Sequence, residues 1–276
     1  VHIFVMDPEK VNYHYCDGLP TTPLPPNTKI LVTGANGYVA RRLIPELVSR
    51  GYFVRCMFRV KRCPPILSHP RMELVYADCL KKDELWPALK DIEVAYYLVH
   101  SMREKRAQFM KRDQNAAKDF VEVAEACGVK KVVYLGGLGE TNEQLSMHLR
   151  SRMEVGSILA NSRINVIQLR AAIIIGSGSA SYELLKSLVT RQRLIPFLPE
   201  FNSRCQPIAI RDVVKYLVGV VEIADLPSGD YHIGSKVIFC YKDLILRFAA
   251  ILRKKVWFFD VAWFPFPVDI LCRIYA

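Results

Sequence analysis

Short β-rich apolar runs alternate with segments of helical apolar spacing between residues 29 and 175. In the segment 113–127, for example, Ala117, Phe120 and Ala124 recur at helical intervals, and Gly128 ends the pattern. Strands that alternate with helices form a parallel sheet covered by helices on both faces. The pattern therefore predicts an α/β fold with a doubly wound parallel sheet. The predicted strands are 29–33, 53–58, 72–76, 93–99, 131–135 and 165–175, and the predicted helices are 38–50, 80–89, 113–127 and 148–159.

The alternation weakens after residue 176, and residues 1–28 precede it without a periodic pattern. Four prolines between residues 20 and 26 favour an extended linker at the end of this first segment. We expect an N-terminal arm at 1–28, a large α/β domain at 29–222 with segments of a second lobe interleaved from about 176, and a small C-terminal lobe or extension at 223–276. Further helices are predicted at 182–190, 211–221 and 243–252.

A glycine-containing loop joins the first predicted strand to the first predicted helix, with the spacing G-x-x-G-x-x-A. Gly34 permits a tight turn, Gly37 lets the backbone approach a pyrophosphate, and Ala40 allows close packing of helix and strand. The start of the helix then offers unpaired N–H groups to the phosphates. This context predicts a dinucleotide site of the Rossmann type. The candidate contacts in the loop are Gly34, Asn36, Gly37, Tyr38 and Val39.

The residue after the second predicted strand distinguishes the two nicotinamide dinucleotides. An acid there would bind the ribose hydroxyls of NAD(H). This chain has Arg59, which can pair with a 2′-phosphate, and Arg42 in the first helix could assist. The sequence therefore favours NADP(H) over NAD(H), with a solvated cation at a strand end as the alternative for Arg59.

Asp78 and Cys79 follow the third predicted strand and are candidates for contact with the adenine. An acid at this place can accept a hydrogen bond from the adenine amino group. A helix cap is the competing interpretation of Asp78.

The composition excludes several classes of protein. With 51% hydrophobic residues the chain is not disordered. Its formal charge of +11 suits phosphorylated ligands, but the cations are dispersed, so solvated surface is the simpler interpretation and no nucleic-acid partner is expected. The eight cysteines form no C-x-x-C pair, so no metal site is expected. Cysteines within apolar runs and the absence of a secretory signal indicate a reducing, cytoplasmic location.

The apolar segment 256–271 has no continuous pattern for a membrane span, because it contains two Asp and two Pro residues. Packing over the domain core is the favoured interpretation. Contact with a following segment or with a membrane surface are the alternatives. Because the chain begins with Val and ends in apolar residues, it is expected to be a piece of a longer protein.

Seven segments of the chain, taken together, resemble the short-chain dehydrogenase/reductase superfamily. They are ILVTGANGYVARRL, YADCL, AYYLVHSM, DQNAAKDFVEVAEACGVKKVVYLGGLGE, HLRSRMEV, VIQLRAAIIIGSGS and QPIAIRDVV. The resemblance covers roughly residues 29–235 and is strongest to the extended and atypical branches, including NmrA-like proteins. It implies a Rossmann domain that binds NAD(P)(H), with a small C-terminal substrate lobe. It also implies hydride transfer to or from a small carbonyl-type substrate.

The catalytic residues of that superfamily are not retained. The resemblance places Gly137 where a Ser is usual, and His148 and Arg152 in place of the Tyr and Lys of a Tyr-x-x-x-Lys pair. The i, i+4 spacing still puts the latter two on one helical face. His148 could transfer a proton, and Arg152 could hold ribose or phosphate oxygens without transferring one.

Other polar residues are expected in the same cleft. His100 and Ser101 follow the fourth predicted strand, so both are candidate cofactor contacts and His100 is a second candidate for proton transfer. Arg170 within the sixth strand is expected to meet cofactor, substrate or an acid. Two hypotheses stay open: an NADP(H)-dependent oxidoreductase or isomerase, and a non-catalytic NADP(H)-binding regulator or assembly factor with a protein partner.

Overall fold

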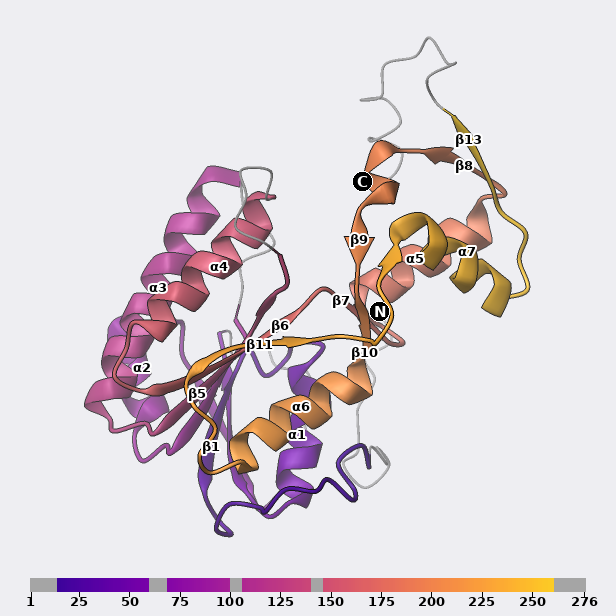
Figure 1. Cartoon of the computed structure of the whole chain (residues 1–276). Helices are drawn as coiled ribbons and strands as arrows, with labels where there is room; N and C mark the ends of the chain where they lie inside the picture. The colour runs from indigo at the N-terminus through magenta and orange to yellow at the C-terminus, as the bar shows by residue number, and fades with distance from the viewer. Residues whose placement is uncertain (1–13, 60–68, 100–105, 140–145, 261–276) are drawn as a thin grey trace. The chain divides into compact units, whose positions relative to one another are not determined.

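The computed structural model describes residues 14–59, 69–99, 106–139 and 146–260. A seven-stranded sheet has the order β11-β6-β5-β4-β1-β2-β3, and every neighbouring pair is parallel (Figure 1). This confirms the α/β class and the doubly wound parallel sheet. The strands of this sheet are β1 (Lys29–Thr33), β2 (Phe53–Phe58), β3 (Met72–Tyr76), β4 (Val94–Tyr97), β5 (Lys131–Gly137), β6 (Asn165–Ala171) and β11 (Gly229–Ile233).

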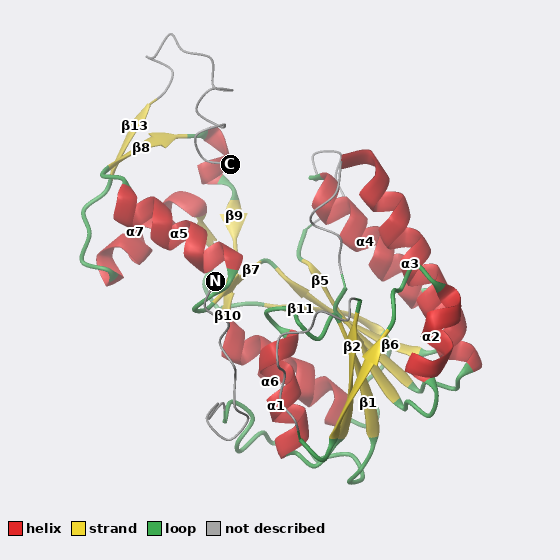
Figure 2. Ribbon diagram, turned by 180° about the vertical axis from the view of Figure 1, so that it is seen from behind, coloured by secondary structure: helices red, strands yellow, loops and turns green. Residues whose placement is uncertain are grey.

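Helices cover both faces of the sheet (Figure 2). On one face, α1 (Ala40–Ser49) and α6 (Ile210–Glu222) contribute buried side chains such as Leu43, Leu47 and Leu217 to a core with β1, β2 and β4. On the other face, the apolar sides of three helices pack against the sheet and form a second core. These helices are α2 (Lys82–Leu89), α3 (Arg106–Ala126) and α4 (Met147–Ala160).

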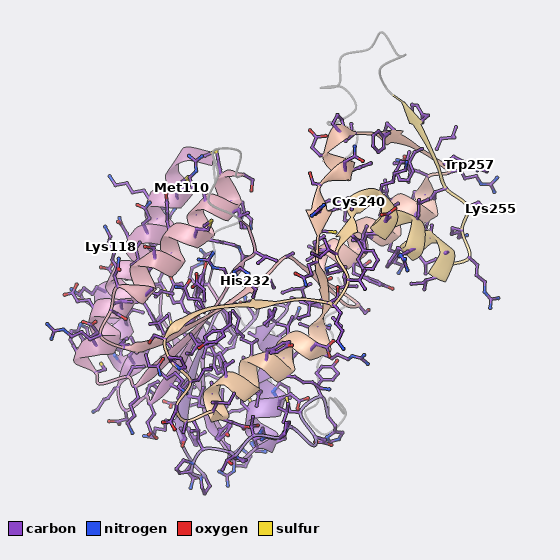
Figure 3. All side chains as sticks on the ribbon, in the orientation of Figure 1. Met110, Lys118, His232, Cys240, Lys255 and Trp257 are labelled. Carbon is purple, nitrogen blue, oxygen red and sulfur yellow. The ribbon has the colours of Figure 1, made fainter. Side chains whose placement is uncertain are left out.

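The chain divides into two compact units, residues 1–174 with 208–234 and residues 175–207 with 235–276. The first unit contains the large sheet, whose edge strand β11 carries His232 (Figure 3). The domain limits expected from the sequence stay a prediction. Strand β11 belongs to the first unit, although the sequence analysis expected the segment 223–276, which contains it, to form the small C-terminal lobe or extension.

The second unit is built around the helices α5 (Ala180–Arg191) and α7 (Tyr241–Ile251). Leu185, Val189, Ile195, Ile245 and Phe248 form its core. The remaining short elements of the chain are β7 (Ile173–Ile175), β8 (Leu194–Phe197), η1 (Pro199–Asn202), β9 (Arg204–Cys205), β10 (Pro207–Ala209), β12 (Phe239–Cys240) and β13 (Trp257–Asp260).

Two buried cations fix the carboxyl ends of helices to the sheet. Lys131, at the start of β5, donates from Nζ to the carbonyl oxygens of Val220, Val221 and Ile223 at the end of α6. Arg55 in β2 donates to three carbonyl oxygens at the end of α2. Cations satisfy the unpaired carbonyl groups at helix ends and interact favourably with the helix dipole.

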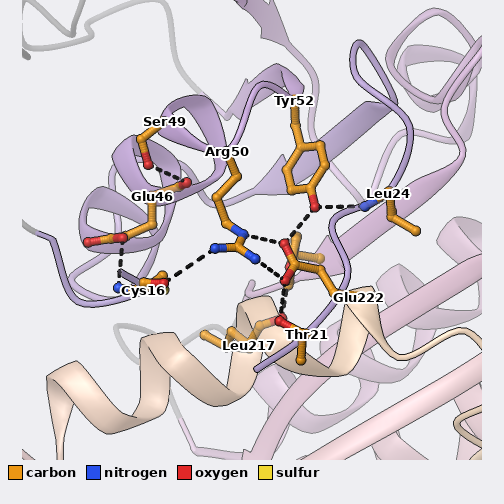
Figure 4. Close-up of polar contacts among 10 residues, drawn as sticks. Cys16, Thr21, Leu24, Glu46, Ser49, Arg50, Tyr52, Leu217 and Glu222 are labelled. Carbon is orange, nitrogen blue, oxygen red and sulfur yellow. Dashed lines mark hydrogen bonds and ion pairs between the residues drawn. The ribbon is translucent and has the colours of Figure 1, made fainter. Parts of the chain in front are cut away.

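The N-terminal arm from residue 14 is attached to the first unit by two buried carboxylates (Figure 4). Glu46 in α1 accepts hydrogen bonds from the backbone N–H groups of Tyr15 and Cys16. Glu222 at the end of α6 accepts from Thr21 of the arm and pairs with the Arg50 guanidinium. The arm is therefore packed against α1 and α6 over its described length, although its prolines suggested an extended linker.

Tyr52 completes this network, because its hydroxyl donates to Glu222 at 2.6 Å and accepts from the backbone N–H of Leu24 at 3.0 Å. Burial and the adjacent Glu222 carboxylate raise the Tyr52 pKa, so the phenol keeps its proton. Tyr52→Phe removes a hydrogen bond to a charged acceptor, and we expect the free energy of unfolding to fall by about 2 kcal/mol.

Chemical denaturation of the full chain measures this change. The matched control is Tyr231→Phe, whose exposed hydroxyl donates to the Pro227 carbonyl oxygen. An equal loss of stability in both variants would show that the Tyr52 hydroxyl has no special part in holding the arm.

Candidate functional site

The loop after β1 is fixed to the neighbouring strand by a threonine that the sequence analysis did not single out. The Thr33 hydroxyl donates to the Tyr96 carbonyl oxygen at 3.1 Å and accepts from the Leu98 N–H at 2.9 Å. Gly34 follows with a φ of +61°, and a Cβ there would lie 3.2 Å from the Leu98 carbonyl oxygen. Both the conformation and the close approach therefore require glycine at position 34. Thr33, fully buried before Gly34, sets the place where the loop begins.

Gly37 closes the same turn, since its N–H donates to the Gly34 carbonyl oxygen at 2.8 Å. A Cβ on Gly37 would lie 3.0 Å from that oxygen. Helix α1 then begins with Val39 as N-cap, without a side-chain cap and without an acid in its first turn. A helix start with no competing carboxylate suits an anionic phosphate group. The loop thus fits the pyrophosphate of a dinucleotide.

Tyr38 and Arg42 form a compact pair at the start of α1. The Arg42 guanidinium carbon lies 3.8 Å from the centre of the Tyr38 ring, and Nη1 donates to the Tyr38 carbonyl oxygen at 3.0 Å. This packing gives the guanidinium a defined position beside the loop. The assisting role of Arg42 toward a 2′-phosphate stays a prediction.

Arg59 directly follows β2 and is exposed, next to the strand that pairs with β1. It is therefore accessible to a ligand that lies across the loop. Asp78 follows β3 and accepts a hydrogen bond from the Leu80 N–H at 3.1 Å, while Lys81 is the N-cap of α2. The Asp78 carboxylate thus stabilises the turn before the helix.

Cys79 lies in the core next to this turn. Burial, together with the nearby Asp78 charge, raises the pKa of its thiol to about 12. A thiol with this pKa is not a nucleophile at neutral pH, so Cys79 can contribute only packing or a backbone contact.

At the carboxyl end of β5, the position of the usual serine is a glycine packed against side chains of α4. A Cβ on Gly137 would lie 2.5 Å from Cδ1 of Leu149 and 3.5 Å from Cδ of Arg152. A serine at 137 would therefore require Leu149 to move. Leu149 and Arg152 of α4 occupy the space into which that side chain would project.

His148 and Arg152 are joined by a direct hydrogen bond on α4. Arg152 Nε donates to His148 Nε2 at 3.1 Å, and Arg152 Nη1 donates to the Leu135 carbonyl oxygen at 3.3 Å. Because a guanidinium N–H only donates, His148 must accept through Nε2, which assigns its ring the neutral form with the proton on Nδ1. Burial first, and then the Arg152 charge, lower the His148 pKa.

The surroundings of Arg152 are partly apolar, and burial lowers its pKa as well. Asp113 of α3 acts in the opposite direction on both groups, and it accepts a hydrogen bond from the Ser151 hydroxyl at 3.2 Å. The arrangement gives a fixed cation next to a neutral imidazole. Such a pair can orient oxygen atoms of a ligand and exchange a proton through the ring.

A family model described as NAD(P)H-binding matches residues 34–178, which is more than half of the chain. This match begins at Gly34 and includes the loop, β5 and α4. The chain belongs to the NAD(P)H-binding family.

Curated relatives of this NAD(P)H-binding protein are distant. It is 26% identical over 136 residues to the photosystem II assembly factor Ycf39 of Cyanophora paradoxa, covering 49% of this chain and 42% of the relative. It is 23% identical over 211 residues to a ceramide reductase of Caulobacter vibrioides, covering 73% of this chain and 66% of the relative. The chain thus spans less than two thirds of either relative.

Solved structures with the same fold include the epimerase Mth375 of Methanothermobacter thermautotrophicus. Its TM-score is 0.70 at 13% identity, with 85% of this chain and 80% of the other covered. The Bordetella bronchiseptica enzyme WbmH, solved in complex with NAD⁺, gives a TM-score of 0.68 at 14% identity, with 84% and 85% covered. At these identities the likeness shows the fold alone. Together with the family match it confirms the resemblance to short-chain dehydrogenases/reductases, while the narrower NmrA-like assignment stays a prediction.

The remaining candidates of the NAD(P)H-binding chain have different outcomes. Arg170 forms an ion pair with Asp230 of β11, which is the acidic partner expected among its alternatives. His100 and Ser101 lie outside the described residues.

The described part of the chain lacks two kinds of feature. None of its helices is both long and apolar enough to cross a membrane. Within the same residues, no three His, Cys, Asp or Glu side chains gather where they could hold a metal ion.

Proposed function

We propose that the chain is an NADP(H)-dependent oxidoreductase or isomerase that acts on a small carbonyl, imine or activated alkene. The observation that carries this proposal is the first turn of α1, which has neither a side-chain cap nor an acid behind the turn of Gly34 and Gly37. Arg59 supports the choice of NADP(H), because it is an exposed cation at the end of β2, where NAD(H) sites have an acid.

A bound nicotinamide supplies or accepts the hydride. In this proposal the loop residues Gly34, Asn36, Gly37, Tyr38 and Val39 hold the pyrophosphate through backbone N–H groups. Asp78, Cys79, His100 and Ser101 are further proposed contacts.

On α4, Arg152 orients the nicotinamide ribose from its anchor on the Leu135 carbonyl oxygen. His148 transfers the proton that accompanies hydride transfer, and its neutral form makes it a base at neutral pH. His100 is the second candidate for this step.

Apolar carbonyl compounds should be among the substrates that are tested for turnover. Relatives are named for such substrates: a ceramide reductase and a 3-beta-hydroxysteroid dehydrogenase of Mycolicibacterium neoaurum. The buried thiols of Cys56 and Cys79 suit a reducing compartment, and we propose a cytoplasmic location.

A second candidate function is a non-catalytic NADP(H)-binding assembly factor or regulator. One specific observation favours it: Gly137, His148 and Arg152 replace the usual Ser, Tyr and Lys, and Leu149 fills the space next to Gly137. The assembly factor Ycf39 among the relatives is named for such a role. In this case bound NADP(H) would stabilise a surface that a protein partner recognises.

Arg59→Ala tests the choice of cofactor. One charge-assisted hydrogen bond contributes roughly 1.5–3 kcal/mol, so the variant should bind NADPH about tenfold or more weakly, with NADH little changed. Calorimetric titration of both cofactors measures the two affinities.

Arg163→Ala is the matched control, because Arg163 is also exposed but lies two residues before β6, at the amino end of that strand, whereas Arg59 follows the carboxyl end of β2. Equal losses for NADPH and NADH in Arg59→Ala would remove the 2′-phosphate assignment and leave the dinucleotide site itself in place.

A further inference from the structure

The second unit has an exposed apolar pair on a two-stranded ribbon. Strands β8 and β13 are parallel, and Trp257 lies directly beside Leu194. The two side chains are 66% and 62% exposed, whereas the next pair, Ile195 and Phe258, packs into the core of the unit. Because side chains alternate along a strand, one face of the ribbon is internal and the other presents Trp257 and Leu194 to solvent.

Exposed cations precede both members of this pair in the sequence. Arg191 and Arg193 precede Leu194, and Lys254 and Lys255 precede Trp257, and all four are exposed. Figure 3 shows Lys255 and Trp257 along the same margin of the unit. Among the described residues, no acid lies within ion-pair distance of these four cations. We name Arg191, Arg193, Leu194, Lys254, Lys255 and Trp257 the Trp257 edge.

We propose that the Trp257 edge is a docking surface for an anionic phospholipid bilayer. A tryptophan with an apolar neighbour suits the boundary between headgroups and acyl chains, where its ring is buried and its N–H stays hydrated. Lysine and arginine side chains around it reach lipid phosphates, and each such cation strengthens binding to an anionic surface by about fivefold. This inference is independent of the proposed function, because the edge shares no residue with the dinucleotide site.

The charge of the edge argues for this occupant over a second copy of the chain. Two copies that met through this surface would bring eight cations together without a described acid between them, which is unfavourable. An anionic bilayer instead complements both parts of the edge at once. The attraction is electrostatic in part, so it should weaken as salt is raised.

Vesicle flotation with the full chain tests the proposal. We expect the chain to float with vesicles of phosphatidylcholine and phosphatidylglycerol, and to bind phosphatidylcholine vesicles much more weakly. Lys254→Gln with Lys255→Gln should weaken binding to the anionic vesicles by about 30-fold. Trp257→Ala should weaken it by about tenfold, because the indole loses its apolar burial.

Matched controls are available in the first unit. Lys111→Gln with Lys118→Gln makes the same change in charge on α3, and Trp86→Ala removes another exposed indole, on α2. Both control proteins should bind as the unchanged chain does, and circular dichroism checks that every variant is folded.

Four outcomes would overturn the proposal. The first is equal binding to neutral and anionic vesicles, and the second is equal weakening in the edge and control variants. The third is displacement of the vesicles by a short DNA duplex that itself needs Lys254 and Lys255, which would identify a nucleic-acid site. Dimerisation that is lost in Trp257→Ala, without vesicle binding, would likewise replace the bilayer by a second copy.

Discussion

Gly37→Val should weaken dinucleotide binding by at least about 100-fold while the domain stays folded. The added Cβ would lie 3.0 Å from the Gly34 carbonyl oxygen, so the turn must open before the side chain fits. Its methyl groups would also occupy the space through which the pyrophosphate approaches the start of α1. Overpacking strain of about 1–3 kcal/mol, added to one lost hydrogen bond to a charged group, gives this magnitude.

Calorimetric titration with NADPH and NADH measures the effect, and Gly37→Ala should give a smaller loss with the same cause. Gly219→Ala is the control, since a Cβ there would meet only the Thr21 methyl carbon at 3.9 Å. Unchanged affinity in Gly37→Val would mean that the ligand does not lie across this loop.

His148→Ala should lower turnover by about 10²–10⁴-fold if the chain is an enzyme, because it removes the titratable group next to Arg152. His148→Gln separates two effects. A glutamine oxygen can still accept from Arg152 Nε and keep the guanidinium in place, but it does not titrate. We therefore expect a comparable loss of turnover in His148→Gln, with cofactor affinity closer to that of the unchanged chain.

The pH dependence follows from the same contact. Burial and Arg152 lower the His148 pKa, so a base at this position is active at neutral pH. The rate should fall as pH drops through a value below the reference of about 6.5, when the ring gains its proton. This titration should be absent in His148→Gln.

The control variant is Arg150→Ala, an exposed position two residues along α4. Turnover that survives both His148 variants would transfer the proton step to another group, with His100 the first to examine. If the unchanged chain never oxidises NADPH with carbonyl and enone compounds, the assembly-factor function is the better account.

Periodicity alone was sufficient to predict the regular part of the sheet. The limits of β1, β2 and β3 agree with the predicted strands, because each is a short run of β-rich residues between clear breaks. The predicted strand 165–175 is in fact two strands, since the chain bends at Ala172 and β7 pairs with β10. A continuous apolar run does not record such a bend.

The sequence analysis did not predict strand β11 or the first part of helix α3, because these segments have few apolar residues. The edge strand β11 has the sequence GDYHI, in which a single residue is fully buried, so no alternation marked it. Helix α3 begins at Arg106, seven residues before its predicted start, because that first part is mostly polar.

The candidate site divides in the same way. Gly34 and Gly37 were identifiable because a turn of this kind demands glycine at fixed spacing. For Arg152 and His148, the sequence predicted that the two side chains share one helical face, but not that they form a hydrogen bond. The position of Leu149 next to Gly137 depends on how α4 packs against β5, which no local pattern specifies.

The attachment of the arm by Glu222 also constrains the order in which the chain can acquire its structure. Thr21 donates to the Glu222 carboxylate, which lies 201 residues further along the chain, and Arg50 and Tyr52 bind the same carboxylate. At synthesis rates of about 5–20 residues per second, that delay is roughly 10–40 seconds. Throughout this interval β1, α1 and β2 can pair and pack locally, but the arm has no anchor at Glu222. Thr21 and its neighbours in the arm are thus synthesised long before the carboxylate that holds them.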